Sequence, residues 1–131
     1  MRTVSRSFAL AAAPLAALVL AGALVGCSGS TKTGTSYTLT PLRTIEAYLP
    51  GGVEKVHNES LAALRDDLKY DITEQKLDAL AGEVKARNAR NTTIRVLTVR
   101  DSDAVTKVTV HSGGDENLGR IILETIEKRL K

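Results

Sequence analysis

Apolar residues change their spacing along the chain, and each change predicts a different element. Over residues 42–49 apolar and polar positions alternate, with Ile45, Ala47 and Leu49 on one side, which predicts a first strand. Pro50-Gly51-Gly52 then ends the alternation. Over residues 53–68 the apolar positions recur at spacings of three and four, which predicts a helix. Its apolar stripe consists of Val53, Val56, Ser60, Leu61, Leu64 and Leu68.

A period of two returns in four further segments. Residues 69–75, 81–87, 92–99 and 104–111 each alternate, and the third segment is the richest in β-branched residues, as strands favour. Turn-forming residues separate the segments at Asp78, at 88–91 and at 101–103. Connections this short favour an antiparallel meander of successive strands.

A second helix is predicted after Ser112-Gly113-Gly114. Asp115 is its expected N-cap, because the carboxylate can accept hydrogen bonds from free N–H groups of the first turn. The predicted stripe consists of Leu118, Ile121, Ile122, Ile126 and Leu130. Neither helix can bury its stripe alone. The pattern therefore predicts an α+β, two-layer sandwich: an antiparallel meander sheet of four to five strands with two helices on one face, in the order β-α-β-β-β-β-α.

The other face of the predicted sheet is mostly polar, as a solvated face should be. It would present Thr73, Lys85, Arg87, Arg95, Leu97, Lys107 and Thr109.

The N-terminal segment has the three parts of an export signal. Arg2 and Arg6 supply positive charge, residues 8–25 are apolar and rich in Ala and Leu, and Leu24-Val25-Gly26-Cys27 closes the segment. Small residues before a cut site let the chain lie extended in a peptidase groove. Cys27 is the one cysteine of the chain, so an internal disulfide and a multi-cysteine metal site are excluded.

This tetrapeptide, with the single cysteine at the end of the apolar run, resembles the bacterial lipobox. The resemblance implies lipidation of the Cys27 sulfur and cleavage between Gly26 and Cys27, which removes residues 1–26 as a lipoprotein signal peptide. The protein would then be held to a membrane by its lipid, outside the cytoplasm. In Gram-negative lipoproteins a serine after the cysteine favours the outer membrane. Ser28 therefore implies the periplasmic side of that membrane if the source is Gram-negative.

Two other interpretations of the segment compete with this one. Residues 8–25 approach the length of about 20 residues that a membrane-spanning helix needs, although Pro14 and the short span argue against an uncleaved helix. The segment could also be an ordinary secretory signal in which Cys27 is incidental. Neither alternative accounts for the position of the single cysteine.

Residues 28–36 are small and polar and include glycine, which predicts a flexible tether with a reach of about 15–18 Å. The expected organisation is therefore a lipidated cysteine and tether over residues 27–41, followed by a single α+β domain over residues 42–131. Removal of residues 1–26 leaves 105 of 131 residues, enough for one domain with one core.

Charge and aromatic content argue against a nucleic-acid partner. Export removes two arginines and no acidic residue, so the net charge falls from +3 to +1. A nearly neutral domain has no electrostatic footprint for nucleic acid. Tryptophan is absent and other aromatic residues are scarce, so stacking platforms for single strands are missing too.

The reactive side chains predict no catalytic, cofactor-binding or metal-binding residues. His57 and His111 fall in different elements, with no second histidine at ligand spacing. Asp66-Asp67 are neighbours on a helix and point in different directions, and the residues 101–103 belong to a turn. General acid–base chemistry needs two carboxylates held in one cleft. No serine lies in a Gly-x-Ser-x-Gly motif, so the sequence predicts a protein that is not an enzyme.

Four segments carry a resemblance to a known family: Leu61-Ala62-Ala63-Leu64, the strand 106–110, the turn Gly113-Gly114-Asp115 and the pair Ile121-Ile122. Over about residues 44–130 the chain resembles a family of short, uncharacterised bacterial lipoproteins. The resemblance implies a fold and an anchor but no activity, because its members are domains of unknown function. The architecture is also similar in outline to small envelope-assembly lipoproteins that support outer-membrane transport machinery, a likeness of fold alone.

Two functions follow as hypotheses. The first is a membrane-anchored lipoprotein whose non-catalytic domain binds an envelope protein or stabilises an assembly, with the open sheet face around Leu97 as its surface. The second is a binder of a small ligand, a lipid or a cell-wall fragment, held between helices and sheet. A continuous cavity between the stripes 61–68 and 121–126 would favour the ligand binder, and tight packing there would favour the interaction domain.

Overall fold

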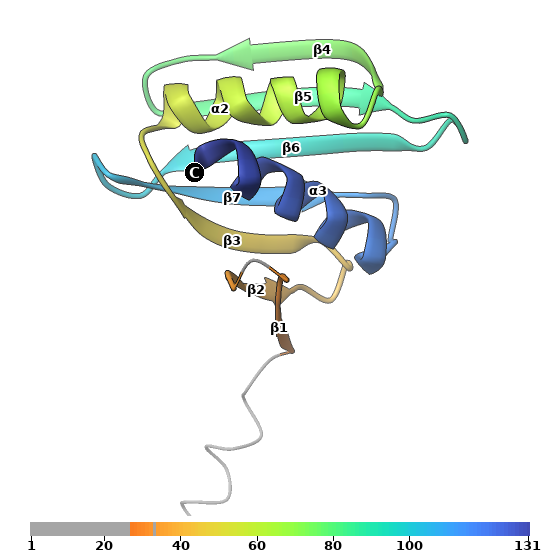
Figure 1. Cartoon of the computed structure of the whole chain (residues 1–131), viewed down its shortest axis with the longest axis horizontal. Coiled ribbons are helices and arrows are strands. Elements are labelled where there is room, and N and C mark those ends of the chain that lie inside the picture. Colours follow the sequence, from red (N-terminus) through yellow and green to blue (C-terminus); the bar gives the residue numbers. More distant parts are fainter. Residues whose placement is uncertain (1–26, 33) are drawn as a thin grey trace, which may run out of the picture.

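The structure is a computed structural model that describes residues 27–32 and 34–131. Over these residues the chain forms one antiparallel sheet of seven strands and two helices, which confirms the predicted α+β class. Both helices lie on the same face of the sheet, as predicted (Figure 1). The predicted signal peptide, residues 1–26, lies outside the described part of the chain.

The last strand along the chain lies in the middle of the sheet. The strands are β1 (Ser28–Ser30), β2 (Ser36–Leu39), β3 (Ile45–Pro50), β4 (Asp71–Leu77), β5 (Ala81–Arg87), β6 (Thr93–Arg100) and β7 (Val105–His111). Their order in the sheet is β1-β2-β3-β7-β6-β5-β4. The four strands β4 to β7 form the predicted meander, while β3 joins it by pairing with β7, so that Ile45 lies opposite Val110.

Two of these strands correct the sequence prediction. β1 and β2 lie in segments interpreted as flexible tether, so the sheet has more strands than the predicted four to five, and its order begins with three strands before the first helix. A small residue in this segment allows β1 to pack closely against β2. Gly29 lies opposite Tyr37, and a side chain at Gly29 would come within 2.7 Å of the Tyr37 ring. β2 pairs with the edge of β3, which satisfies its backbone groups.

The first helix has the predicted extent but two geometries. α2 (Val53–Ala62) continues directly into a π-helical segment, η2 (Ala63–Asp67). The Leu68 N–H donates to the Ala63 carbonyl, five residues earlier, at 2.9 Å. Lys69 then adopts a positive φ of 59°, which ends the helix and turns the chain into β4.

The closing helix, α3 (Glu116–Leu130), is capped as predicted but buries a different stripe. The Leu118 N–H donates to the Asp115 carboxylate at 3.1 Å. Ile122 and Ile126 are fully buried, as expected. However, Ile121 is 45% exposed, and the fully buried neighbour is Leu123, which was not predicted. The predicted stripe was therefore wrong at one position.

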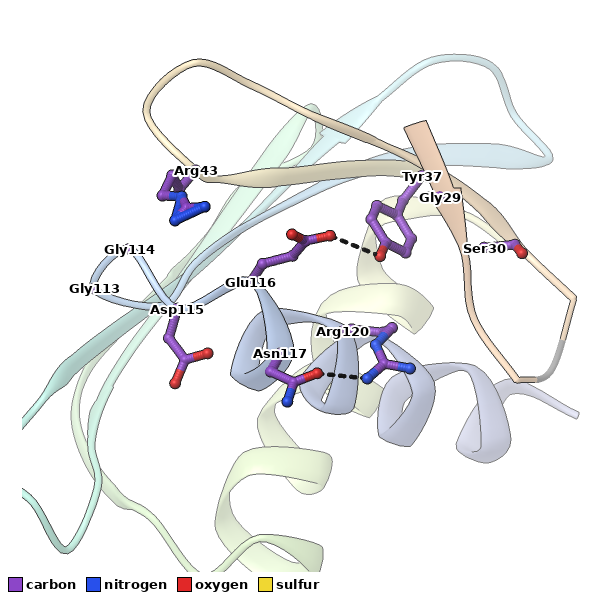
Figure 2. Close-up of a pocket in the computed structure, with 10 residues that line it drawn as sticks. All are labelled: Gly29, Ser30, Tyr37, Arg43, Gly113, Gly114, Asp115, Glu116, Asn117 and Arg120. Carbon is purple, nitrogen blue, oxygen red and sulfur yellow. Dashed lines mark hydrogen bonds between the residues drawn. The ribbon is translucent and has the colours of Figure 1, made fainter. Parts of the chain in front are cut away.

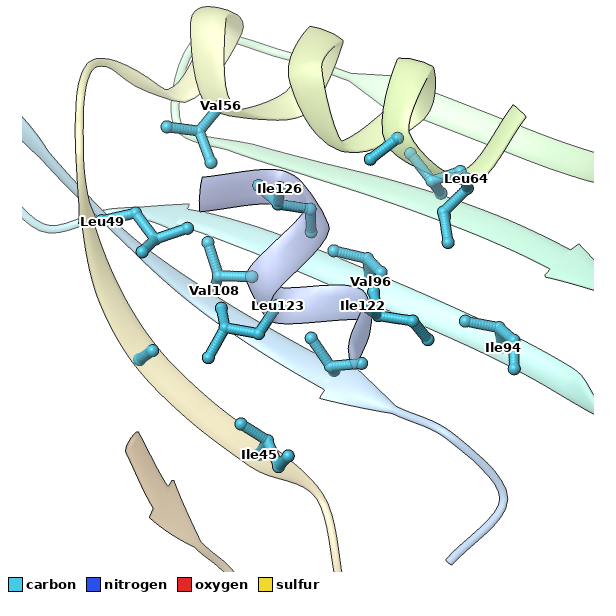
Figure 3. Close-up of a cluster of buried hydrophobic side chains, with 14 of the residues drawn as sticks. Ile45, Leu49, Val56, Leu64, Ile94, Val96, Val108, Ile122, Leu123 and Ile126 are labelled. Atoms are coloured by element: carbon cyan, nitrogen blue, oxygen red, sulfur yellow. The ribbon is translucent and has the colours of Figure 1, made fainter. Parts of the chain in front are cut away.

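The core fills the space between the helices and one face of the sheet (Figure 3). Every second residue of β3 is buried in this core, namely Ile45, Ala47 and Leu49. β7 contributes Val108 and Val110 in the same way. The seven residues predicted for the opposite face are all at least partly exposed. The alternation therefore assigned the two faces of the sheet correctly.

Candidate functional site

Cys27 lies at the edge of the sheet with an exposed thiol. Its carbonyl accepts the Leu39 N–H at 3.2 Å, and the three residues that follow it pair with β2. Gly26, the other residue of the predicted cleavage site, lies outside the described residues. The predicted lipid site is therefore joined directly to the folded sheet.

The hairpin of β1 and β2 is held to α3 by carboxylates. Glu127 Oε2 accepts from the Thr35 hydroxyl at 2.6 Å and from the Thr31 hydroxyl at 3.4 Å. One turn earlier, Glu124 Oε1 accepts from the Lys32 N–H at 3.1 Å. These contacts join residues more than 90 positions apart in the sequence. Hydrogen bonds to charged groups are among the stronger ones, so the hairpin is fixed to the body of the domain.

A cleft of about 730 Å³ lies between this hairpin and the first turns of α3 (Figure 2). In Figure 2 the Tyr37 hydroxyl points at Glu116, and Arg120 is turned toward Asn117. The Tyr37 O–H donates to Glu116 Oε2 at 3.2 Å. The cleft is lined by Gly29, Ser30, Tyr37, Arg43, Gly113, Gly114, Asp115, Glu116, Asn117 and Arg120.

The environment of Tyr37 raises the pKa of its hydroxyl above the usual value, first through burial and then through the hydrogen bond to Glu116. Replacing Glu116 by glutamine should therefore lower the pKa of Tyr37 toward its usual value, while burial still keeps it raised. The reason is that a carboxylate opposes a tyrosinate charge and an amide does not. A pH titration of tyrosinate absorbance, assigned with Tyr37→Phe, measures the change.

The control for this titration is Glu54→Gln, which removes an exposed acidic residue from the first turn of α2. Equal effects of the two variants would show that Glu116 does not act on Tyr37 directly.

Because the pKa of Tyr37 is raised in the folded state, the stabilisation linked to Tyr37 is present below the usual tyrosine pKa. It is lost as the pH rises through the raised value.

Several polar side chains of the cleft contact one another or the backbone. Asp115 caps α3, Glu116 accepts from Tyr37, and Arg120 donates to Asn117. Gly113 and Gly114 both have positive φ, 67° and 86°, which only glycine adopts readily. This loop shapes the rim of the cleft. Figure 2 shows the carboxylates of Asp115 and Glu116, which both line the cleft, pointing away from each other.

The structure keeps the two histidines apart. His57 is buried on α2, and its Nε2 lies 3.0 Å from the Gln75 side-chain oxygen of β4. A side chain at Gly82 would come within 2.5 Å of His57 Nδ1, so this glycine makes room for the ring. His111 lies on the open face of the sheet, where burial and then Arg95 lower its pKa. In residues 27–32 and 34–131 no three His, Cys, Asp or Glu side chains gather as a metal site requires.

The carboxylate pairs identified in the sequence lie on the surface. Asp66 pairs with Arg65 at 2.9 Å, and the hydrogen bond from this neighbour lowers the pKa of Asp66. Asp67 pairs with Arg129 of α3 at 3.2 Å. Residues 101–104 form the exposed turn between β6 and β7. The carboxylates are thus spread over separate ion pairs and a turn.

The open face of the sheet carries ion pairs between neighbouring strands. Lys107 lies 3.4 Å from Glu46, and Lys85 lies 2.9 Å from Glu74. A third pair joins Arg95 to Glu83. This face therefore has few uncompensated charges, although it carries many charged residues.

Two exposed apolar side chains on this face were missed in the sequence. Tyr48 is 57% exposed and Val99 is 46% exposed, and both are strand partners of Lys107. The alternation of the strands could have identified both residues. Tyr48 alternates with buried Ala47 and Leu49, and Val99 is in phase with Leu97. Together Tyr48, Leu97 and Val99 form what we term the open-face patch.

The space between the helices and the sheet is filled by side chains. Leu64, Ile122 and Ile126 are fully buried there. The larger clefts found in the described part of the chain lie at the rim, at the ends of strands and helices. Within residues 27–32 and 34–131 there is no helix of the length and apolarity needed to cross a membrane.

Comparison with known protein families identifies the family to which the chain belongs. The family described as "Protein of unknown function (DUF3568)" matches residues 5–129. Because this match spans most of the chain, the protein belongs to that family. The predicted likeness to a family of unknown function is thereby confirmed, while the family description says nothing of a lipid anchor. A search of curated proteins found no match.

Proposed function

We propose that this member of the family is a membrane-anchored, extracytoplasmic lipoprotein whose domain binds a protein of the cell envelope. Lipid on Cys27, left after removal of residues 1–26, holds it to the membrane. In a Gram-negative source this is the periplasmic side of the outer membrane. The domain acts as a binding module, without catalysis or a cofactor.

The observation that carries the proposed binding role is the open-face patch. Both helices cover the other face of the sheet, so Tyr48, Leu97 and Val99 lie on a face that the described residues leave uncovered. Aromatic residues are enriched in protein interfaces, and a rim of polar residues usually surrounds them. Lys107 lies between Tyr48 and Val99 and is paired with Glu46, and Glu83, the strand partner of Leu97, is paired with Arg95.

The packing of the core favours this proposal over a small-ligand binder. A ligand held between the helices and the sheet needs a cavity there, and Leu64, Ile122 and Ile126 are fully buried in that space. The rim cleft beside Tyr37 is open and mainly polar in its lining. It therefore lacks the enclosed apolar walls that a lipid tail would need.

Affinity capture from crosslinked membranes tests the proposed binding role. The full chain, tagged at its C-terminus, is expected to capture one protein in stoichiometric amount. Tyr48→Ala should reduce that capture severalfold, because an exposed aromatic residue at the centre of an interface often carries much of the binding free energy. Leu80→Ala is the matched control, since Leu80 is 60% exposed but lies in the turn between β4 and β5.

The same experiment with Cys27→Ser separates anchoring from binding. A partner captured by the wild-type chain and lost with this variant would show that binding requires the processed, lipidated chain. Equal loss in Tyr48→Ala and Leu80→Ala would contradict the role of the open-face patch. Capture of no protein above background would contradict the binding role itself, and extraction of small molecules from the purified domain would then test the ligand binder.

A further inference from the structure

We propose that one end of the sheet faces the bilayer and that Leu42, at the tip of the turn between β2 and β3, inserts into the membrane interface beside the anchor. This inference rests on the proposed lipid at Cys27 and adds to it a fixed orientation of the domain. Its partner is the lipid surface itself, which is distinct from the protein proposed for the open-face patch.

The connection between anchor and domain is too short to allow free rotation. Ser28 pairs with Thr38 directly after the cysteine, and the Cys27 carbonyl accepts the Leu39 N–H at 3.2 Å. The hairpin is in turn held to α3 through Glu124 and Glu127. A lipid on Cys27 therefore holds the domain at one place on its surface, in contrast to the predicted tether of nine small residues.

The antiparallel register defines the end of the sheet that the anchor holds. β1 begins, β2 ends and β3 begins at this end, because Ser28 lies opposite Thr38 and Leu39 lies opposite Ile45. The turns 40–44, 88–92 and 112–115 also lie there, and we term it the anchor end. The turns 78–80 and 101–104 lie at the opposite end. In Figure 1 the start of β1 projects from the sheet close to the turn between β2 and β3.

A rigid turn presents Leu42 at the anchor end. The Arg43 N–H donates to the Thr40 carbonyl at 2.8 Å, and the Thr40 N–H donates to the Thr44 carbonyl at 2.9 Å. The hydroxyls of Thr40 and Thr44 lie 2.6 Å apart and close the base of the turn. Pro41 suits the second position of such a turn because its φ is fixed. At the tip, Leu42 is 82% exposed, the highest value among the exposed large apolar side chains of the described residues.

The charges of the two ends suit this orientation. The turns 40–44 and 88–92 of the anchor end carry Arg43 and Arg90, and the turns 78–80 and 101–104 of the opposite end carry Asp78, Asp101 and Asp103. The acidic exceptions at the anchor end include Asp71, Asp115, which caps α3, and Glu116, which binds Tyr37. The basic exceptions at the opposite end include Lys32, in the turn between β1 and β2, and Arg100, which pairs with Asp103. Anionic lipids attract arginine side chains close to the surface and repel carboxylates. The basic turns should therefore face the lipid, and the acidic turns should face away from it.

The absence of tryptophan from the chain allows a direct test. The full, lipidated chain carrying Leu42→Trp is reconstituted in vesicles of phosphatidylethanolamine and phosphatidylglycerol that contain lipids brominated near the headgroup end of the acyl chain. The introduced tryptophan should lose most of its fluorescence to bromine, and its emission should shift to the blue. Leu80→Trp is the matched control at the opposite end, and its fluorescence should not respond to the brominated lipids.

Mass spectrometry of the same samples separates this inference from the proposed function. A vesicle-bound chain with lipid on Cys27, in which the two tryptophan positions respond equally or only position 80 responds, would overturn the orientation and leave the anchor intact. A chain without lipid on Cys27 would overturn both. Protection of position 42 from an aqueous quencher without quenching by bromine would indicate contact with a second copy of the chain, and would also overturn insertion into lipid.

Discussion

Replacing Cys27 by serine is expected to abolish the lipid modification and to leave residues 1–26 uncleaved. A serine hydroxyl does not accept the thioether-linked lipid that the lipobox resemblance implies. The wild-type chain should carry the lipid and be held in the membrane by it, because each buried methylene contributes about 0.8 kcal/mol and two or more chains hold a protein stably. Mass determination of the N-terminus of each chain measures lipidation and cleavage.

The position of Cys27 makes this substitution specific for the anchor. Its side chain is exposed, and its contact with the sheet runs through the backbone carbonyl that accepts the Leu39 N–H. Serine keeps that carbonyl, so the fold should be unchanged, which circular dichroism can check. Ser28→Ala is the neighbouring control and should remain processed and membrane-bound.

Each competing interpretation of the N-terminal segment predicts a different result. An uncleaved membrane-spanning helix would leave residues 1–26 on the wild-type chain as well, with no lipid on Cys27. An ordinary secretory signal would be removed from both chains and leave both of them soluble. Either result would refute the lipid anchor and, with it, the orientation proposed for Leu42.

The elements that the sequence predicted well are those in which local pattern and tertiary burial agree. β5 begins and ends where the alternation over residues 81–87 does, because Val84 and Ala86 enter the core at every second position. Asp115 caps α3 as expected, because capping depends on the residue beside the helix end. The meander followed from short turns, which leave antiparallel pairing as the available connection.

The elements that were missed depend on contacts between distant parts of the chain. Nothing in the local composition of residues 28–36 predicts a strand. The hairpin forms against β3 and is held by Glu124 and Glu127, nearly a hundred residues away. The cleft at Tyr37 was missed for the same reason, because its lining combines the hairpin with the start of α3. Local propensity is a weak predictor where such tertiary contacts decide.

The error at Ile121 has a geometric cause. Successive helical residues are about 100° apart, so the three consecutive residues Ile121, Ile122 and Leu123 span about 200° of the helix circumference and cannot all face the sheet. The face of α3 that meets the sheet includes Gly119, where a side chain would come within 2.9 Å of Ile45 Cδ1. This close approach centres the stripe on Ile122, Leu123 and Ile126. Ile121 is left on the far side of the helix.

Substitution of Leu123 by alanine is therefore expected to lower the free energy of unfolding by about 2–5 kcal/mol. Leu123 is fully buried between α3 and the sheet (Figure 3), so truncation removes apolar contacts and leaves a cavity that the surroundings fill only in part. Ile121→Ala is the matched control on the neighbouring position. It should change the free energy of unfolding by no more than about 0.5 kcal/mol, because Ile121 is 45% exposed and alanine favours helix.

Urea unfolding of residues 27–131, followed by far-ultraviolet circular dichroism, compares the two variants on one scale. The difference in midpoint, at similar dependence on urea, gives the difference in stability. A larger loss for Ile121→Ala than for Leu123→Ala would mean that α3 is rotated about its axis and buries the stripe that the sequence predicted. Since Glu124 and Glu127 hold the anchoring hairpin from the adjacent face, such a rotation would also displace the contacts that fix Cys27 to the domain. The stability of this one pair of variants thus tests the helix orientation on which the rigid attachment of the anchor depends.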